Sequence, residues 1–198
     1  MVGIGGREYT FWLDCLRRGM LMAIDHPAAV KLKEKFPGMG LKGSQFRGDT
    51  QIIVPRGNLV EVVGFLKSEP TLNYNQLSDL TCVDYLNYPG AAKEGRFGMV
   101  YVFNSIAMKG GEGSPRVIVR VFLQEGELEV DSLVAVYAGA EWMEREVYDM
   151  FGVVFNGHPD LRRILTWDGF KAHPLRKDYP VTGRGEREKY PVLTRDSA

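Results

Sequence analysis

Two segments in the middle of the chain, residues 97–106 and 116–123, alternate large apolar side chains with other residues. Successive side chains of a β-strand point to opposite faces of a sheet, so a period of two residues predicts strands with one buried face. A third segment of this kind covers residues 77–85. Glycine- and proline-containing linkers separate the three segments, which favours hairpin-like connections and an antiparallel or mixed sheet.

Shorter patterns upstream predict two helices and a hairpin. Apolar residues recur at helical spacing over residues 27–36, with Asp25 before Pro27 as the N-terminal signal, and over residues 59–66 after Asn58. Between these helices, the stretches 39–46 and 49–54 predict a hairpin. The order α-β-β-α-β-β-β predicts an α+β fold, with an antiparallel or mixed sheet covered by helices on one face.

A third helix is predicted over residues 138–151, with Gly152 as its C-terminal stop. Glu141, Arg145 and Asp149 follow one another at a spacing of four residues, which is typical of a charged, solvent-facing stripe. Beyond Gly152, no sustained periodicity remains. We therefore predict an α+β domain at 1–137, followed at 138–198 by this helix and a long extended C-terminal interaction arm.

The arm keeps many large apolar side chains, which a chain rarely exposes unless they dock on something. Docking on its own domain and docking on another protein both fit this composition. The residues are Phe155, Leu161, Ile164, Leu165, Trp167, Phe170, Leu175, Tyr179 and Tyr190.

The chain has 25 basic and 25 acidic residues, but they are unevenly distributed. Residues 123–150 contain eight acidic residues and one basic residue, whereas residues 157–198 contain nine basic and six acidic residues. Such asymmetry affects which partners a surface binds. Bases interleaved with aromatic residues could contact nucleic acid. The pI of about 6.8 and the acids among the bases argue against it, so no nucleic-acid partner is expected.

Several other classes of protein are disfavoured. No apolar run approaches the roughly 18 residues that a membrane-spanning helix needs. Charged residues such as Arg7, Glu8 and Arg17 interrupt the beginning of the chain, unlike the core of a secretory signal, so we expect the protein to stay in the compartment where it is made. Cys15 and Cys82 are too few for a disulfide framework and are expected to be buried, reduced thiols.

The sequence gives little support for a catalytic or metal-binding site within this chain. Glu144 or Glu146 with His158 could form a metal site or an acid–base pair in a self-contained enzyme such as a hydrolase, but the two glutamates point about 200° apart on a helix. Charged helix surface or partner ion pairs are the favoured interpretation. The three histidines, His26, His158 and His173, each precede a proline and fit turns or interfaces. The glycines at residues 3–6 lack the dinucleotide-binding spacing, and no phosphate-binding loop motif occurs.

One long motif goes beyond general patterns. It reads AEWMEREVYDMFGV over residues 140–153, FNGHPDLRRIL over 155–165 and HPLRKDYP over 173–180. It resembles the signature of the 30 kDa subunit family of respiratory complex I, which is the C subunit of the proton-pumping NADH:quinone oxidoreductases. Residues 77–85 also resemble that family's strand before the central hairpin, and the predicted element order agrees with its fold.

The resemblance implies a non-catalytic structural subunit in the peripheral arm of a membrane-associated NADH:quinone oxidoreductase. That complex couples electron transfer from NADH to quinone with proton translocation. No cofactor would be bound by this chain, and FMN and iron–sulfur clusters would lie in other subunits. The implied partners are the quinone-site D subunit and the cluster-bearing B and I subunits. Membrane contact would be only through this hetero-oligomer, on the cytoplasmic side of the cell inner (plasma) membrane. An equivalent subunit of a related complex, with ferredoxin, a deazaflavin or hydrogen as electron donor, is the alternative.

By the same resemblance, the motif forms the partner interface. Arg162, Arg163, Arg176 and Lys177 would make contacts between subunits. Trp142 and Tyr148 would anchor the motif helix, with ordinary core residues as the alternative. The full set of expected interface residues is Trp142, Glu144, Arg145, Glu146, Tyr148, Asp149, Phe151, Gly152, Gly157, His158, Pro159, Asp160, Leu161, Arg162, Arg163, His173, Pro174, Leu175, Arg176, Lys177, Asp178, Tyr179 and Pro180.

Overall fold

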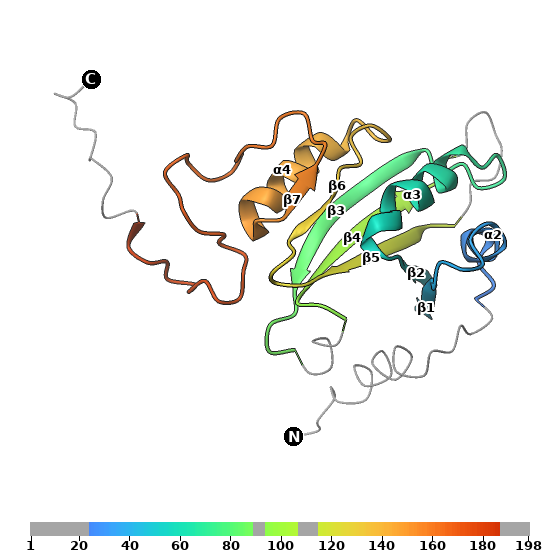
Figure 1. Ribbon diagram of the computed structural model, residues 1–198, viewed down its shortest axis with the longest axis horizontal. Coiled ribbons are helices and arrows are strands. Elements are labelled where there is room, and N and C mark those ends of the chain that lie inside the picture. Colours follow the sequence, from blue (N-terminus) through green and yellow to red (C-terminus); the bar gives the residue numbers. More distant parts are fainter. Residues whose placement is uncertain (1–23, 89–93, 107–114, 187–198) are drawn as a thin grey trace.

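A computed structural model describes residues 24–88, 94–106 and 115–186 (Figure 1). Its centre is a five-stranded sheet with the strand order β1-β2-β5-β4-β3. Neighbouring strands are antiparallel except β2 and β5, which are parallel. The mixed α+β architecture predicted from the sequence is therefore confirmed. The strands are β1 (Lys42–Phe46), β2 (Asp49–Ile53), β3 (Gln76–Asp84), β4 (Phe97–Asn104) and β5 (Val117–Leu123).

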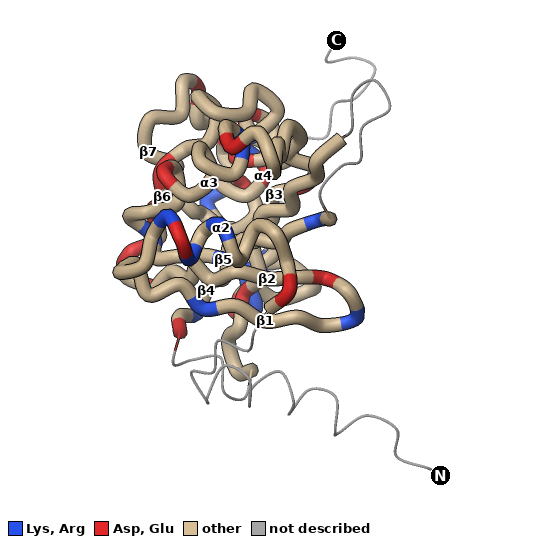
Figure 2. The backbone as a smooth tube through the Cα atoms, turned by 90° about the vertical axis from the view of Figure 1, so that its right-hand side faces the viewer, with Lys and Arg blue, Asp and Glu red and all other residues tan. Residues whose placement is uncertain are grey.

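Three α-helices of the described chain lie on one side of this sheet (Figure 2). Helices α2 (Pro27–Lys35) and α3 (Leu59–Ser68, after the short 3-10 helix η1, Arg56–Asn58) bury their apolar stripes in the core. Helix α4 (Ala140–Phe151) packs against β3 and adds its own apolar residues to the same core. The strand residues facing them include Ile52, Leu80, Met99, Tyr101, Val119 and Val121.

The beginning of α2 differs from the prediction in one residue. The N-terminal cap is His26 and not Asp25, because the His26 Nδ1 accepts a hydrogen bond from the Ala28 backbone N–H at 3.3 Å. Pro27 occupies the first helical position, where a missing N–H costs nothing. His26 is thus a buried capping residue, in agreement with its predicted role in a turn.

The chain after α4 is more ordered than predicted. Strand β7 (Val154–Asn156) pairs in parallel with β6 (Glu129–Asp131) in a second, two-stranded sheet. The extended part therefore begins only at Gly157, and "the arm" below means residues 157–186. In Figure 1 the arm loops around the outer side of α4, at the far end of the molecule from α2. The division into an α+β domain at 1–137 and a helix with an arm at 138–198 stays a prediction. Helix α4 shares the core of the strands.

Some sequence expectations fall outside the described residues, namely those on residues 3–6, Cys15 and Tyr190. Cys82 is buried in the core as expected. Burial raises the pKa of its thiol to about 12. Within the described ranges, no helix has both the length and the apolar character needed to cross a bilayer.

Candidate functional site

Asp149, in the last turn of α4, holds the arm against the helix. Its side chain is fully buried, and its carboxylate accepts hydrogen bonds from the Arg163 guanidinium at 2.7 Å and from three successive backbone N–H groups. These belong to Ile164, Leu165 and Thr166, at 3.1, 2.8 and 2.8 Å, and the Thr166 hydroxyl also donates to it. One side chain thereby fixes the path of four consecutive residues.

This arrangement compensates for an unfavourable position. A carboxylate near a helix C-terminus is repelled by the helix dipole, and burial also disfavours its charge. Burial raises the pKa of Asp149, but the hydrogen bonds from Thr166, Leu165 and Arg163 outweigh it and bring the pKa below its ordinary value. The carboxylate is therefore held in its charged form, as a buried anchor.

A second anchor joins the arm to the end of β3. The buried Asp84 carboxylate accepts two hydrogen bonds from the Arg96 guanidinium, at 2.9 and 3.1 Å, and one from the Lys177 backbone N–H at 2.9 Å. Arg96 also pairs with Asp178 of the arm at 3.0 Å. Burial raises the pKa of Asp84, but its bonds to Arg96, Lys177 and Leu86 lower it below the ordinary value. The predicted motif residues 177 and 178 thus contact their own domain.

Between the two anchors the arm lies directly on the end of α4. The Arg176 Nε donates to the Phe151 carbonyl at 2.6 Å, and the His173 Nδ1 lies 3.0 Å from the Asp149 carbonyl oxygen. Gly152 ends the helix as predicted, with a left-handed φ of 76°. A Cβ at this position would lie 2.5 Å from the His173 Nε2 and 2.6 Å from an Arg176 nitrogen. Glycine is therefore required by both the backbone and the arm.

Gly152→Ala is expected to lower the free energy of unfolding by about 2 kcal/mol, because a left-handed backbone costs an L-residue about 1–2 kcal/mol and the new methyl group also displaces His173 and Arg176. Gly64→Ala is the matched control. A Cβ at Gly64, inside α3, has no neighbour within 4 Å, so alanine should raise stability there by about 0.5–1 kcal/mol. Urea unfolding of both variants checks the pair, and equal effects of the two substitutions would contradict it.

The prediction of a solvent-facing stripe on α4 is wrong for Arg145 and Asp149, and the prediction of a charged helix surface is wrong for Glu144. Glu144, Arg145 and Asp149 are 0%, 5% and 0% exposed. The Arg145 Nε donates to the Arg162 carbonyl at 3.3 Å, and its guanidinium lies 4.8 Å from the centre of the Trp142 ring. The polar residues turn inward because the arm and the segment between β6 and α4 offer them partners that a helix in isolation does not have.

The Glu144 carboxylate is held by the segment before α4, and among the described residues no hydrogen bond joins it to Glu146 or His158. Its carboxylate accepts hydrogen bonds from the Leu133 backbone N–H at 2.7 Å and from the Ser132 hydroxyl at 2.6 Å. Burial raises the pKa of Glu144, and these bonds, together with the nearby charge of His158, offset only part of that effect. Glu146 is exposed. Among the described residues, no group of three or more metal-ligating side chains could hold a metal ion.

His158 and the residues around it form a turn. Its Nδ1 accepts from the Asp160 backbone N–H at 3.0 Å, and its Nε2 lies 3.1 Å from the Glu141 carbonyl oxygen. The exposed Asp160 carboxylate pairs with Arg162 at 2.9 Å. The histidine therefore joins the start of the arm to the start of α4, as the interpretation as a turn residue predicted.

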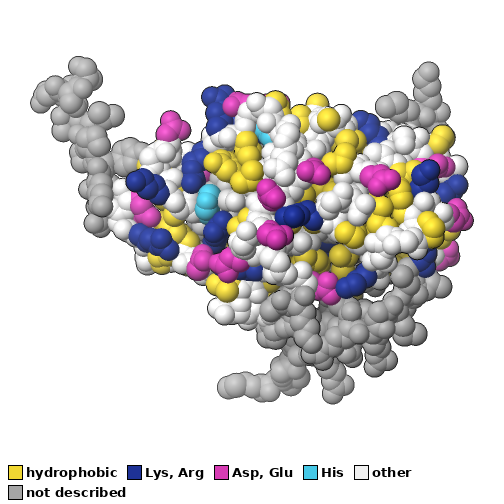
Figure 3. Space-filling model, in the orientation of Figure 1, with side chains coloured by type: hydrophobic (Ala, Val, Ile, Leu, Met, Phe, Trp, Pro, Cys, Tyr) yellow, Lys and Arg dark blue, Asp and Glu magenta, His cyan; other side chains and the backbone are white. Residues whose placement is uncertain are grey.

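Several large side chains remain on the surface of α4 and the arm. Trp142 is 61% exposed, Leu165 63% and Leu175 54%, and Val181 is fully exposed. Interpretation of Trp142 as ordinary core is therefore wrong, whereas Tyr148 is half-buried. Hydrophobic and basic side chains lie next to one another over α4 and the arm in Figure 3. Such a mixture is typical of protein interfaces.

The remaining apolar residues of the arm pack partly on themselves. Phe170 is buried, with ring centroids 4.9 Å from Trp167 and 5.9 Å from Tyr179. Docking of the arm on its own domain thus accounts for part of its apolar character. The exposed side chains named above are the part that this docking leaves uncovered.

The structure sorts the other expected interface residues by exposure, and their contacts with partners stay a prediction. Exposed are Glu146, Gly157, Pro159, Asp160, Arg162, Lys177, Asp178 and Pro180; half-buried are Tyr148, Gly152, His158, Leu161, Arg163, His173, Pro174, Arg176 and Tyr179; Phe151 is buried. Sequence reasoning missed Asp84, Arg96 and Ser132, which hold the motif in place. Asp84 lies within residues 77–85, which resemble the family's strand, but that resemblance gave it no role, and no sequence signal marks Arg96 or Ser132.

Residues 52–185 match the model of a protein family described as the respiratory-chain NADH dehydrogenase 30 kDa subunit. The matched range contains the end of β2, all of β3, β4 and β5, helices α3 and α4, and nearly all of the arm. Both anchors, Asp84 and Asp149, lie inside it.

Individual proteins agree with this match. The chain is 46% identical over 169 residues to the C subunit of the NADH-quinone oxidoreductase of Geobacter metallireducens, covering 85% of this chain and 97% of the relative. A solved trypsin-resistant fragment of Nqo5 (residues 1–134) shares 31% identity, with a TM-score of 0.59 over 68% of this chain and 99% of the fragment. A chain in the structure of an archaeal membrane-bound sulfane sulfur reductase shares the fold, with 23% identity and a TM-score of 0.64 over 84% of this chain and 91% of that chain. The chain thus belongs to the 30 kDa subunit family of the respiratory-chain NADH dehydrogenase.

Proposed function

We propose that this chain is a non-catalytic structural subunit, equivalent to the C subunit of its relatives, in the peripheral arm of an NADH:quinone oxidoreductase. The assembled complex would transfer electrons from NADH to quinone and couple this transfer to proton translocation. Family membership and 46% identity to the C subunit of an NADH-quinone oxidoreductase support the proposal. The observation that carries it is the exposed Trp142 on the motif helix, beside an arm that the chain itself holds in shape.

The arm holds its exposed residues in a fixed position, and this is the physical argument for a structural role. Residues that a partner contacts lose less conformational entropy on binding if they are already ordered. Asp149 and Asp84 use buried charge to order the arm, while Leu165 and Leu175 on the same arm remain exposed. The motif's polar residues thus shape an interface and need not take part in chemistry.

The partners and the place of the chain follow from the same proposal. The expected neighbours are the quinone-site D subunit and the cluster-bearing B and I subunits, with FMN and iron–sulfur clusters bound in other subunits and none in this chain. Exposed basic residues such as Arg162 and Lys177 favour acidic patches on those neighbours. The protein would lie on the cytoplasmic side of the inner (plasma) membrane and touch it only through the complex.

Purification of the tagged chain from its native host in mild detergent, with mass spectrometry of the proteins that accompany it, tests this function. Flavin-binding, cluster-binding and membrane subunits in stable proportion are expected. If the accompanying proteins include an electron-input subunit for ferredoxin, a deazaflavin or hydrogen, that compound and not NADH is the electron donor of the complex. A lone chain with turnover of its own or with bound metal would contradict the proposal.

Trp142→Ala is expected to weaken incorporation into the complex about 30-fold, since truncating a tryptophan at the centre of an interface costs about 2 kcal/mol or more. The yield of partner subunits per tagged chain measures this effect. Val60→Ala is the matched control, because Val60 is a partly exposed apolar residue on α3, away from the motif. Thermal unfolding of the isolated variants should be unchanged in both cases. Normal incorporation of the Trp142 variant would exclude this residue from the interface.

A further inference from the structure

Arg145 of α4 is a buried basic side chain that has no acidic partner in the described part of the chain. The residue is only 5% exposed, and arginine is almost never buried to this degree unless it is paired. Two other deeply placed arginines follow that rule, because Arg96 pairs with Asp84 at 2.9 Å and Arg163 with Asp149 at 2.7 Å. Arg145 is therefore the exception that needs an explanation.

The acids closest to Arg145 along α4 do not neutralise it. Glu141, four residues earlier, has the spacing of a helical ion pair, yet within the described ranges it forms none with Arg145. Asp149, four residues later, is held by the arm, and Glu144 is held by the segment before the helix. The positive charge of Arg145 is left without a matching negative charge.

Most of the hydrogen-bonding capacity of Arg145 is also unused. Its Nε donates to the Arg162 carbonyl at 3.3 Å, which leaves the four N–H groups of its two Nη atoms without an acceptor among the described residues. The Nη atoms are not fully enclosed and still reach solvent. The guanidinium is thus held in a buried position with its free end open to the surface.

Trp142 covers one face of this guanidinium. The centre of the indole ring lies 4.8 Å from the Arg145 Cζ, and the tryptophan itself is 61% exposed. An arginine that is stacked on an aromatic ring keeps its N–H groups free, because they lie in the plane of the guanidinium and not on its face. The contact therefore fixes the orientation of the guanidinium and leaves its edge available to an acceptor.

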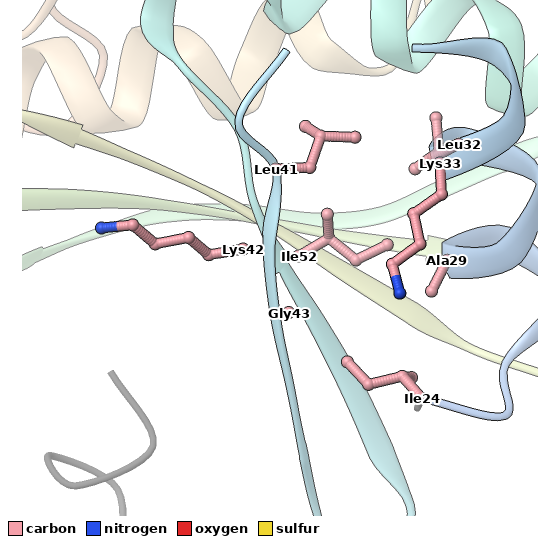
Figure 4. A pocket seen from close by; sticks show the side chains of 8 residues that line it. All are labelled: Ile24, Ala29, Leu32, Lys33, Leu41, Lys42, Gly43 and Ile52. Carbon is pink, nitrogen blue, oxygen red and sulfur yellow. The ribbon is translucent and has the colours of Figure 1, made fainter. Parts of the chain in front are cut away.

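Lys42 shows how a basic side chain is ordinarily accommodated in this protein. It borders a small pocket between α2 and β1 that is lined mainly by apolar residues such as Ile24, Leu32 and Ile52, and Figure 4 shows its side chain pointing away from that pocket. The Lys42 side chain is 48% exposed, and its Nζ pairs with Glu94 at 2.9 Å. Both water and an acid thus stabilise its charge, whereas Arg145 has little access to the first and lacks the second.

We propose that Arg145 and Trp142 form a binding site for a carboxylate side chain, an aspartate or a glutamate, of a neighbouring subunit. The carboxylate accepts two parallel hydrogen bonds from the Nη atoms, a geometry that matches the planar guanidinium, and Trp142 packs against the apolar part of the same segment. Tryptophan and arginine are the residue types that contribute most at protein interfaces. This inference rests on the proposed function, because the carboxylate belongs to a neighbour in that complex.

Arg145→Met separates this role from a role in folding. Replacing a buried charge with an apolar side chain of similar size is often neutral or stabilising, so the isolated full-length chain should unfold at the same urea concentration as the parent or at a higher one. The yield of partner subunits per tagged chain should fall about 30-fold or more. This factor corresponds to about 2 kcal/mol, the lower end of the cost of removing one member of a buried charge pair at an interface.

Two matched substitutions are the controls. Arg116→Met removes an exposed arginine that pairs with Asp49, and it should leave the yield of partner subunits unchanged. Arg163→Met breaks the buried pair with Asp149, and it should lower the urea concentration at which the chain unfolds. The proposal would be overturned if Arg145→Met lost as much stability as Arg163→Met, or if it assembled as well as Arg116→Met.

Arg145→Lys identifies the carboxylate directly. This variant places an amine at the site, and a water-soluble carbodiimide joins an amine to a contacting carboxylate as an amide, with loss of water. Mass spectrometry of the treated complex should find a cross-link from position 145 to an aspartate or glutamate of another subunit, and the parent complex should lack it. A cross-link to an acid of this same chain, residues 187–198 included, would overturn the proposal, as would the absence of any cross-link in an assembled complex.

Failure of this inference can be distinguished from failure of the proposed function. If the parent chain itself carries no other subunits, the proposed function is wrong. If the parent complex forms and Arg145→Met is incorporated equally well, the proposed function stands and only the carboxylate site is wrong.

Discussion

Asp149→Ala is expected to lower the free energy of unfolding by about 3–5 kcal/mol, the usual cost of removing one partner from a buried ion pair. The substitution leaves Arg163 without its carboxylate and leaves three backbone N–H groups, at residues 164–166, without their acceptor. Urea unfolding of the isolated chain measures the loss. Limited proteolysis should also show cleavage within the arm before the sheet unfolds, because the arm loses its anchor first.

Asp160→Ala is the matched control for this experiment. Asp160 pairs with Arg162, but their side chains are 49% and 70% exposed, and a surface pair of this kind contributes at most about 1 kcal/mol. If the two variants lost a similar amount of unfolding free energy, the burial of Asp149 would not determine how much this residue contributes to stability. An intact arm in Asp149→Ala would show that the arm is held by other contacts.

The anchors also determine how stability depends on pH. Asp149 and Asp84 have pKa values below their ordinary range in the folded chain. Their contribution is therefore fully present above the unfolded aspartate pKa of about 3.9 and is lost as the pH falls through the folded values. The contribution of Glu144 to stability changes with pH in the opposite direction. Because folding raises the pKa of Glu144, this residue destabilises the folded chain as the pH rises above the ordinary pKa of a glutamate. We expect the stability difference between the parent and Asp149→Asn to shrink below about pH 4, as unfolding at several pH values would show.

Arg96→Ala should have an effect of similar size, about 3–5 kcal/mol, for the same physical reason. The Asp84 side chain is 1% exposed and the Arg96 side chain 10%. Among the described residues, the substitution leaves the buried carboxylate with hydrogen bonds from the backbone N–H groups of Leu86 and Lys177 alone. Asp178 and Glu125, which also pair with Arg96, would lose this partner as well. Thermal and urea unfolding measure the effect.

Two further variants make the Arg96 prediction specific. Arg96→Lys keeps the positive charge but cannot bind both Asp84 oxygens in the same fork-like geometry, so it should recover only part of the loss. Arg116→Ala, which breaks the exposed pair with Asp49, should cost no more than about 1 kcal/mol. Full stability in Arg96→Lys would mean that charge alone, and not the two-pronged hydrogen bonding, holds the anchor.

These anchors connect the fold to the proposed assembly. Arg96 ties β4 to the arm through Asp84 and Asp178, and Asp149 ties α4 to the arm's first half. Variants that release the arm should therefore lose partner subunits even though the exposed interface residues are unchanged. Trp142→Ala should do so without loss of stability, which separates the interface from its support.

Elements with a local physical cause could be predicted from the amino-acid sequence. Alternation at residues 97–106 and 116–123 predicted β4 and β5, because a half-buried strand needs one apolar face. Helical spacing predicted α2, α3 and α4, and Gly152 predicted the end of α4, because only glycine readily takes the left-handed backbone found there. The family motif could also be identified from the sequence, because it consists of long runs of specific residues.

The tertiary structure alone decided where the charged residues of α4 face. Arg145 and Asp149 follow the spacing of a solvent-facing stripe that begins at Glu141, and Glu144 was expected on the charged helix surface, yet these three residues, 144, 145 and 149, are buried. A charge can be buried only if partners satisfy it, and those partners are the backbone at Leu133, the carbonyl of Arg162 and the N–H groups of residues 164–166. They come from segments that the chain brings together only on folding. Local periodicity cannot record them, because it describes one helix and not the groups packed against it.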